Sequence, residues 1–297
     1  MENNFEHPQE TGLVEELPVL ALDVPDKELI ENFKRWENDA KTFWDDPKGY
    51  NLEARRKKNM RYWKGIQIDE NKLYSYQIPY IQNELFIATE TITAYTTSSD
   101  PAAEVLPEDG ETQSKVMAES LEWGLNVHSE KFKLGEKINK IERSMYLKYV
   151  GIIKLYWDEV AQDIVPRVIE PENIVVDKSC RMGENPLFIC ETCTATVQQI
   201  FNLFPEKKDA FMREIGRVRT SSKLESSVYA YKEVWFTEIT DEGETECVAW
   251  YVGNLLLWKA KNPNFLYDGD GVQLTNFLPR PMKPYIFFNY MNSGAHD

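Results

Sequence analysis

The hydrophobic period of this chain changes at Gly151, and that change constrains the fold more than any other feature. Over residues 111–150, apolar side chains recur every three or four positions, which is typical of an amphipathic helix. After Gly151, short segments alternate or are wholly apolar and are rich in β-branched residues, which is typical of strands. Because the helical patterns come first and the strand patterns second, the sequence predicts an α+β fold.

An acidic segment and two helical patterns open the chain. Residues 1–26 carry Glu and Asp but no Lys or Arg, and prolines interrupt them, so we expect a flexible acidic arm. The stretch LVEELPVLAL within this arm is apolar enough to dock on a neighbour. Asp26 is expected to cap a helix over residues 27–44, and Gly65 to end a second helix that begins near Asn51.

A third helix is expected to have Pro79 in its first turn and to end in the Ser- and Pro-containing segment 98–101. Residues 111–150 would then form a rod of about 60 Å if the helix is continuous, at a rise of about 1.5 Å per residue. Gly124 and Gly135 each cost about 1 kcal/mol relative to Ala, so a break at either position is the alternative. The apolar face of the third helix contains Ile78, Ile81, Leu85, Ala88, Ile92 and Tyr95.

The long helical pattern has one apolar stripe, which only His128 and Gly135 interrupt. We expect this stripe to pack against the sheet that follows Gly151, and His128 to be a packed residue rather than a ligand. The stripe contains Met117, Leu121, Leu125, Phe132, Ile138, Ile141, Met145 and Tyr149.

Strands and short helices are predicted after Gly151. Residues 152–158 and 163–170 form a strand pair joined by an acidic turn, and residues 186–196 form a further strand. Short helices are expected on both sides of Pro205, with hairpin turns at 241–243 and 253–254. Four more strands are predicted at residues 227–239, 244–253, 254–260 and 283–291. The chain therefore divides into the arm 1–26, a helical part 27–150 and a β-rich part 151–297.

The charge balance bears on which partners the chain can bind. Lys and Arg total 34 and Asp and Glu total 49 of 297 residues, giving a net charge of −15. That balance opposes general adhesion to nucleic acid or to anionic membranes, because phosphate binding needs clustered cations. The sequence shows no signal peptide and no apolar run near the roughly 18 residues that would span a bilayer. We expect an intracellular soluble protein without a membrane partner.

Four cysteines in a chain of this length do not form a disulfide framework. Cys190 and Cys193 make a C-x-x-C motif within a predicted strand, and a metal site there would need further Cys or His ligands nearby. We therefore interpret them as structural thiols. The stretch YDGDGVQL (residues 267–274) is similar to the start of a calcium loop, but Pro279 stands at its twelfth position, so an ordinary turn is favoured.

Signatures of a phosphate loop, a nucleophile elbow and a zinc protease are absent from the sequence. We expect no enzyme activity, no cofactor and no metal, and we assign no catalytic residues. One basic cluster has Tyr62 and Trp63 interleaved and is either a contact for DNA or an acidic partner, or a solvated helix face with both aromatic rings turned inward. The second alternative is favoured because the surrounding chain is acidic. The cluster contains Arg55, Arg56, Lys57, Lys58, Arg61 and Lys64.

Five stretches in a fixed order carry a family resemblance. They are RRKKNMRYWKGIQID, IPYIQNELFIATETITAYTTSSDPAAEVLP, GIIKLYWDEVAQDIVPRVIEPENIVVDKS, an FI…ET strand with the helix end LFPEKKDAF, and KPYIFFNYMNSG. Together they resemble the amino-terminal part of tailed-bacteriophage portal proteins, over roughly residues 27–290. Each stretch alone is a packing or turn pattern, so the order of the five carries the resemblance. The strand pair after Gly151 would belong to the wing of such a subunit.

The resemblance implies a structural protein at the unique capsid vertex, in a homo-oligomeric ring of about twelve copies. DNA would be packaged and ejected through this ring without sequence-specific binding. The implied partners are the major capsid protein, the packaging terminase and head–tail adaptor proteins. The implied location is the virion, with assembly in the host bacterial cytoplasm.

One departure from the portal pattern leaves alternatives open. Portal subunits usually continue into a stem, a clip and a crown, whereas this chain stops at Asp297, so we expect those parts to be absent or not included. The first alternative is another head–tail adaptor or capsid-associated structural protein of a phage. The second is an enzyme whose site the sequence does not reveal.

Overall fold

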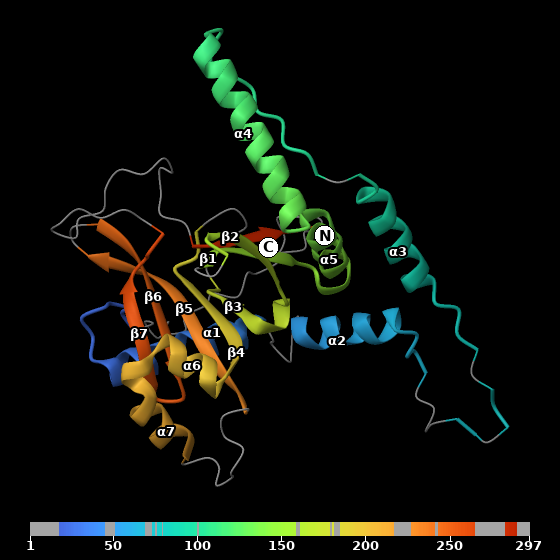
Figure 1. Cartoon of the computed structure of the whole chain (residues 1–297). Helices are drawn as coiled ribbons and strands as arrows, with labels where there is room; N and C mark the ends of the chain where they lie inside the picture. The colour runs from blue at the N-terminus through green and yellow to red at the C-terminus, as the bar shows by residue number, and fades with distance from the viewer. Residues whose placement is uncertain are drawn as a thin grey trace, which may run out of the picture.

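The computed structural model describes residues 18–44, 51–68, 73–74, 76–78, 80–99, 101–158, 161–178, 180, 185–216, 227–240, 243–264 and 283–289. The fold is α+β, as the sequence predicts, with helices first and antiparallel strands after them (Figure 1). The leading helices are α1 (Asp26–Trp44), α2 (Leu52–Trp63), α3 (Glu84–Thr96), α4 (Thr112–Lys131) and α5 (Leu134–Lys148).

The described strands form two antiparallel sheets. A three-stranded sheet has the order β2-β1-β8, from β1 (Gly151–Asp158), β2 (Asp163–Ile169) and β8 (Tyr285–Phe288). A five-stranded sheet has the order β3-β4-β5-β6-β7. Its strands are β3 (Ile174–Val176), β4 (Phe188–Thr196), β5 (Val228–Thr240), β6 (Gly243–Val252) and β7 (Leu255–Lys261). The strand pair after Gly151 and the hairpins at Gly243 and Gly253 are thus confirmed.

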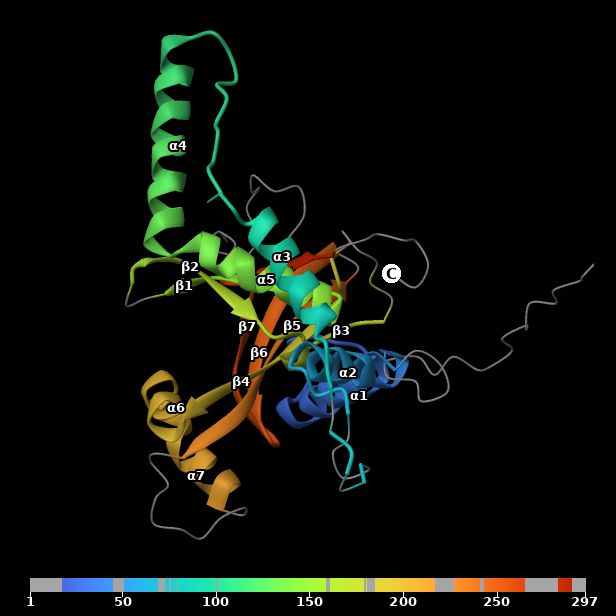
Figure 2. The ribbon, with the colours of Figure 1, turned by 90° about the vertical axis from the view of Figure 1, so that its right-hand side faces the viewer.

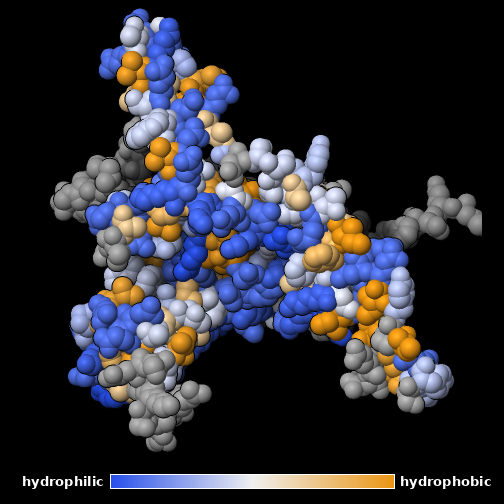
Figure 3. Space-filling view, turned by 45° about the vertical axis from the view of Figure 1, so that its right-hand side comes forward, coloured by the Kyte–Doolittle hydropathy of each residue, from blue (hydrophilic) through white to orange (hydrophobic). Residues whose placement is uncertain are grey.

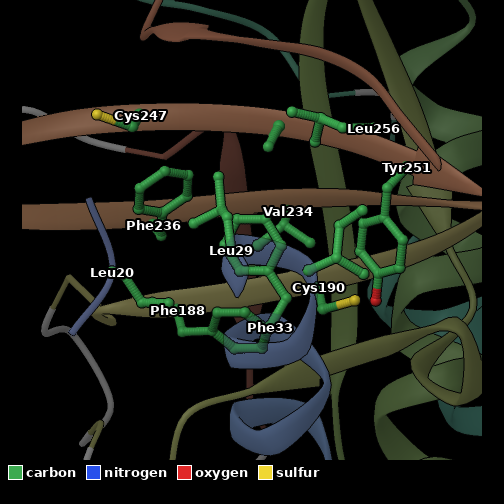
Figure 4. Packing of buried hydrophobic residues seen from close by; sticks show 12 residues of the cluster. Leu20, Leu29, Phe33, Phe188, Cys190, Val234, Phe236, Cys247, Tyr251 and Leu256 are labelled. Carbon is green, nitrogen blue, oxygen red and sulfur yellow. The ribbon is translucent and has the colours of Figure 1, made fainter. Parts of the chain in front are cut away.

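Helix α1 covers one face of the five-stranded sheet. Its apolar residues repeat at helical spacing, so Leu29, Ile30 and Phe33 all turn toward the sheet and are fully buried. The Phe33 ring packs against Phe236 of β5, with 5.2 Å between ring centroids, and against Phe188 of β4 (Figure 4). This helix–sheet layer is the main core of the molecule.

The segment before α1 belongs to the same core, so the expectation of a flexible arm over residues 1–26 does not extend to residues 18–25. Leu20 is buried in the α1 cluster (Figure 4), and the Trp36 indole N–H donates to the Pro18 carbonyl at 2.8 Å. Asp26 is the first residue of α1 rather than its cap, and the Leu29 N–H donates to the Pro25 carbonyl. An apolar stretch gains more from burial on its own sheet than from exposure to water.

The opposite face of the five-stranded sheet is covered by two units. Ile152, Ile169 and Tyr285 of the three-stranded sheet pack against Ile189 and Trp235 of the larger sheet. The short helices α6 (Val197–Leu203) and α7 (Lys208–Gly216) cover its far end, away from α4 (Figures 1 and 2). Two 3-10 turns, η2 (Pro171–Asn173) and η3 (Pro205–Lys207), connect these elements. The result is three layers, with the large sheet in the middle.

The long helical pattern is broken into α4 and α5 at Lys133, whose φ of 51° lies in the left-handed region. The break therefore lies beside Gly135 but not at it, and Gly124 continues α4. Helix α5 does pack on the strands, burying Ile141 and Leu147. Gly151 permits this contact, because a Cβ there would lie 2.4 Å from Ile141 Cγ2.

The prediction that the apolar stripe packs against the sheet is wrong for its amino-terminal half, which lies on α4. Helix α4 projects away from the sheets (Figures 1 and 2), and Met117, Leu121 and Leu125 are 65%, 53% and 52% exposed. The physical reason is the turn at Lys133, which sends α4 in a different direction from α5. Of the residues in α4, Ala118 alone is buried.

The prediction for the third helix is also wrong in part. Helix α3 begins at Glu84 with Asn83 as its cap, whereas Pro79 lies outside the described residues. Its buried side chains are Thr89 and Thr93. Most of the expected apolar face is open to solvent, with Ile78, Ile92 and Tyr95 exposed and Ile81 and Leu85 half-buried, because α3 packs on α2 and α5 through the side that carries its threonines.

Candidate functional site

The predicted basic cluster lies on α2, and the structure separates its members. Asn51 caps this helix by accepting from the Ala54 N–H at 2.7 Å, and Gly65, with a φ of 78°, follows its end. Five of the six cations share the solvent side, which we call the basic face of α2. It consists of Arg55, Lys57, Lys58, Arg61 and Lys64, all of them exposed.

The inner side of α2 is fixed to α5 and α3 by hydrogen bonds. Arg56, the sixth cation of the cluster, turns inward, and its Nε donates to the Lys148 carbonyl at 2.9 Å. Asn59 donates to the Leu147 carbonyl at 3.0 Å, and the Trp63 indole donates to Glu90 at 3.2 Å. These bonds hold the basic face of α2 in a fixed orientation.

The two aromatic residues of the cluster have different surroundings. Trp63 turns inward, as the solvated-face alternative predicts, and packs on Phe86 with 5.5 Å between ring centroids. Tyr62 stays 39% exposed on the basic face of α2, so the prediction that it turns inward is wrong. The Lys58 ammonium lies 5.4 Å from the centre of its ring, a cation–π distance. The basic face of α2 therefore combines charge with an exposed aromatic ring.

A second surface is formed by α4 and the segment that leads to it. From here on, the arm means residues 101–131 and not the acidic segment 1–26. The leading segment runs along α4: Asn126 accepts from the Ala103 N–H at 2.8 Å and donates to the Ala103 carbonyl at 3.2 Å. Glu122 accepts from the Val105 N–H at 3.1 Å. Ala118, Glu122 and Asn126 thus occupy the one side of α4 that its own chain covers.

The remaining sides of α4 carry two rows of exposed apolar side chains. Figure 3 shows hydrophobic patches among hydrophilic residues on this projecting helix. Val116, Trp123 and Val127 form the first row, in which the Trp123 side chain is 71% exposed. The second row contains Met117, Leu121 and Leu125. At 3.6 residues per turn the two rows are about 140° apart around the helix. Exposed apolar rows of this kind are a common feature of interaction surfaces, so α4 is a candidate for one.

The base of the arm is attached to the three-stranded sheet. The His128 ring nitrogen Nε2 lies 2.7 Å from the Ile164 carbonyl of β2, and its ring packs on Phe132. Lys131 forms an ion pair with Asp163 at 2.5 Å, and that hydrogen bond lowers the pKa of Asp163 below its ordinary value. His128 is therefore half-buried against β2 rather than packed in a core, and its contacts help to set the direction of α4.

A third surface is the solvent side of α3 and the stretch before it. Ile87, Ile92 and Tyr95 are 59%, 45% and 82% exposed, and we call them the α3 face. The preceding stretch adds further exposed apolar residues, namely Tyr74, Tyr76, Ile78 and Tyr80. Glu90, on the inner side of α3, forms a two-bond ion pair with Arg143 of α5 at 2.8 Å per bond. This pair keeps the α3 face turned outward.

Between the two sheets lies a buried ion cluster that the sequence analysis did not identify. Lys154 of β1 contacts Glu191 of β4 at 2.9 Å and Glu233 of β5 at 2.5 Å. Tyr285 donates to Glu191 at 2.8 Å, and Arg167 of β2 pairs with the other Glu191 oxygen. The one sequence signal for this cluster is a charged residue, Lys154, within the apolar strand β1. The signal is weak, because Glu191 and Glu233 are distant from Lys154 in sequence.

The charges of this cluster stabilise one another. Burial by itself would lower the pKa of Lys154, but the neighbouring Glu233 and Glu191 carboxylates outweigh it and raise that pKa. Burial likewise opposes ionisation of Glu191, but Lys154 and Arg167 lower its pKa below the ordinary value of 4.5. Lys154, Arg167 and Glu191 are thus each favoured in their charged form.

The donor set of the cluster allows a test for metal binding. Among the described residues, Glu191, Cys193 and Glu233 bring ligand atoms within 4.8 Å of one another. The carboxylate oxygens there already bind Lys154 and Arg167, and burial raises the pKa of the Cys193 thiol to about 12. A cysteine binds a metal ion as the thiolate, and the Cys193 thiol is held protonated, so this set fits an internal lysine better than a metal ion.

The C-x-x-C motif lies within β4, and its two thiols are free and buried. Residues three apart on a strand point to opposite faces, so Cys190 packs in the α1 core whereas Cys193 borders the ion cluster. They cannot bind one ion together, and each has the structural position that the sequence analysis expects. The calcium-like stretch 267–274 lies outside the described residues.

An open pocket of about 300 Å³ lies between α5 and β2, and four of its nine lining residues are cations. Lys133 pairs with Glu136 at 3.3 Å, Lys137 donates to the Phe132 carbonyl, and Arg167 pairs with Glu191. Three of its cations are therefore bonded within the chain. The pocket is a seam between α5 and β2 rather than a built anion site.

Comparisons with known proteins add no family assignment. The chain matches no model of a known protein family, and no curated protein is similar to it in sequence. Across the part of the chain that the structure describes, no helix is both long and apolar enough to cross a membrane. The surfaces described above are therefore the basis on which a function is proposed.

Proposed function

We propose that this chain is a structural subunit that assembles with copies of itself into a ring, and that the ring is the portal of a tailed phage. The observation that carries this proposal is the arm. Helix α4 has 20 residues but buries only Ala118, while Trp123 and Met117 are more than half exposed. A projecting helix with this composition gains free energy only when another molecule covers it.

The arrangement of the exposed rows favours a ring over a simple pair. The Trp123 row and the Leu121 row face directions about 140° apart, so one partner cannot cover both. In a ring of identical subunits every copy has one neighbour on each side, which supplies two partners. The resemblance of five ordered sequence stretches to portal proteins supports the same assembly.

The charge distribution supports passage of DNA through such a ring. The net charge of −15 repels the phosphates of DNA. Each phosphate contact that the ring avoids lowers its affinity for DNA, and a lower affinity lets DNA slide through faster. The major capsid protein, the packaging terminase and head–tail adaptor proteins are the proposed partners, and the capsid vertex within the virion is the proposed location.

The test is the assembly state of the purified protein and its position in a virion. Sedimentation and negative-stain imaging are expected to show rings of about twelve copies, and imaging of virions to show one ring at a single vertex. A protein that sediments as a monomer at every concentration contradicts the proposal. Capsomer-like abundance in the virion also contradicts it.

A further inference from the structure

We infer that the arm of one copy docks on the basic face of α2 and the adjacent α3 face of the next copy. This inference rests on the proposed self-assembly and specifies the contact that would produce it. Two observations carry it: complementary charge and complementary exposure of apolar side chains on the two surfaces.

The tip of the arm is acidic. Over residues 104–119 the acidic side chains are Glu104, Glu108, Asp109, Glu111 and Glu119, all exposed, and Lys115 is the one cation. Over residues 52–64, by contrast, six Lys and Arg residues accompany a single acid, Glu53, and five of the six lie on the basic face of α2. In a chain with a net charge of −15, α2 is the concentrated cationic element among the described helices. Opposite patches of this kind steer association and suppress wrong pairings.

Apolar side chains accompany the charges on both surfaces. On α4, Glu119 lies beside the row of Val116, Trp123 and Val127, because the four residues share one side of the helix. Opposite them would lie Tyr62 of α2 and the α3 face, whose Ile87 and Tyr95 are 59% and 82% exposed. A buried aromatic anchor within a charged rim is the usual composition of a stable interface.

The position of the two surfaces makes the contact intermolecular. The tip of α4 points away from α2 in both ribbon views, so one copy does not cover its own basic face (Figures 1 and 2). The basic face of α2 and the α3 face lie on helices that pack together. Two different surfaces on one chain that fit each other form a head-to-tail interface, which closes into a ring when the rotation per copy permits.

The acidic segment 1–17 is the competing occupant of the basic face of α2. It carries Glu2, Glu6, Glu10, Glu15 and Glu16 and no Lys or Arg. Its charge would match α2, but its apolar side chains, among them Phe5, Leu13 and Val14, include no Trp and are flanked by Glu15 and Glu16. We therefore assign the arm to this surface and test the segment by deletion.

The experiment uses two charge-reversal variants of the full chain. The arm variant combines Glu108→Lys and Glu119→Lys, and the α2 variant combines Lys58→Glu and Arg61→Glu. Each alone is expected to weaken ring formation by about tenfold or more, because like charges then face each other. A one-to-one mixture of the two variants is expected to restore rings, since every reversed surface finds a reversed partner. Matched controls on α7 and its preceding turn, Glu206→Lys with Asp209→Lys and Lys208→Glu with Arg213→Glu, should assemble like the parent.

Circular dichroism and thermal melting establish that each variant is folded before assembly is measured. If the parent forms rings and both variants assemble normally, or if the mixture stays unassembled, the docking inference is wrong while the proposed ring stands. If the parent is a monomer, the proposed ring and the docking inference are both wrong. If deletion of residues 1–17 abolishes assembly and the arm variant does not, the acidic segment is the occupant and the inference is overturned.

Discussion

Lys154 of β1 and Glu191 of β4 join the two sheets through a contact of 2.9 Å between Nζ and Oε2, with side chains only 5% and 4% exposed. The two residues belong to different sheets, and each lies in a fully buried run of its strand. The pair therefore fixes how the three-stranded sheet sits on the five-stranded one.

Replacing Lys154 with Met should destabilise the fold strongly. The substitution keeps the volume of the side chain but leaves Glu191 and Glu233 buried without their common cation. Removing one partner of a buried pair costs about 3–5 kcal/mol. Urea unfolding measures the loss, with Lys140→Met on the exposed side of α5 as the control. Equal midpoints for the two variants would contradict the assigned role of the pair.

Stability should fall in acid as Glu191 becomes protonated. Because its folded-state pKa is below the ordinary 4.5, the unfolded chain binds more protons between the two values, and stability rises with pH there. The contribution is present above pH 4.5 and is lost as the pH falls through the folded-state pKa. Unfolding followed from pH 7 downward should show this loss in the parent and a flatter profile in Glu191→Gln. An unchanged slope in the variant would rule the carboxylate out as a source of the acid sensitivity.

Truncation along the former apolar stripe should separate folding from assembly. Ile141→Ala removes a side chain only 3% exposed and should cost about 2–5 kcal/mol in unfolding free energy. Leu121, which is 53% exposed, should change the melting of the isolated subunit little when replaced with Ala, but should weaken ring formation. Thermal melting at a concentration below assembly and sedimentation above it distinguish the two effects. A collapse of Leu121→Ala in the dilute subunit would show that α4 is packed.

Gly151 and Gly124 should respond in opposite directions to Ala. A Cβ at Gly151 would lie 2.4 Å from Ile141 Cγ2 and 2.6 Å from the Ile141 carbonyl oxygen, so α5 and β1 would have to separate. Overpacking of this kind costs about 1–3 kcal/mol. A Cβ at Gly124 meets nothing within 4 Å, so helix propensity should make Ala there stabilising by about 1 kcal/mol. Chemical unfolding of the two variants gives the sign of each change in unfolding free energy. A Gly151→Ala protein as stable as the parent would refute the close approach of α5 to β1.

The local sequence pattern determined where most helices and strands form. The helical spacing of Leu29 and Phe33, the end of α2 at Gly65 and the strand pair after Gly151 all follow from side-chain periodicity and from residues that favour particular backbone angles. The α+β order follows from the same signals. The six-residue basic cluster could likewise be located on a helix, because sequence spacing fixes which residues share a side.

Tertiary structure alone decided the directions of the elements and their partners. The left-handed turn at Lys133 sends α4 out into solvent, and no periodicity distinguishes an apolar row that meets a sheet from one that stays exposed. Arg56 turned inward because α5 offered its Lys148 carbonyl. Lys154, Glu191 and Glu233 met because two sheets stacked, which brings together residues far apart in sequence. Periodicity is a property of one segment, whereas burial and charge pairing depend on which other segments lie against it.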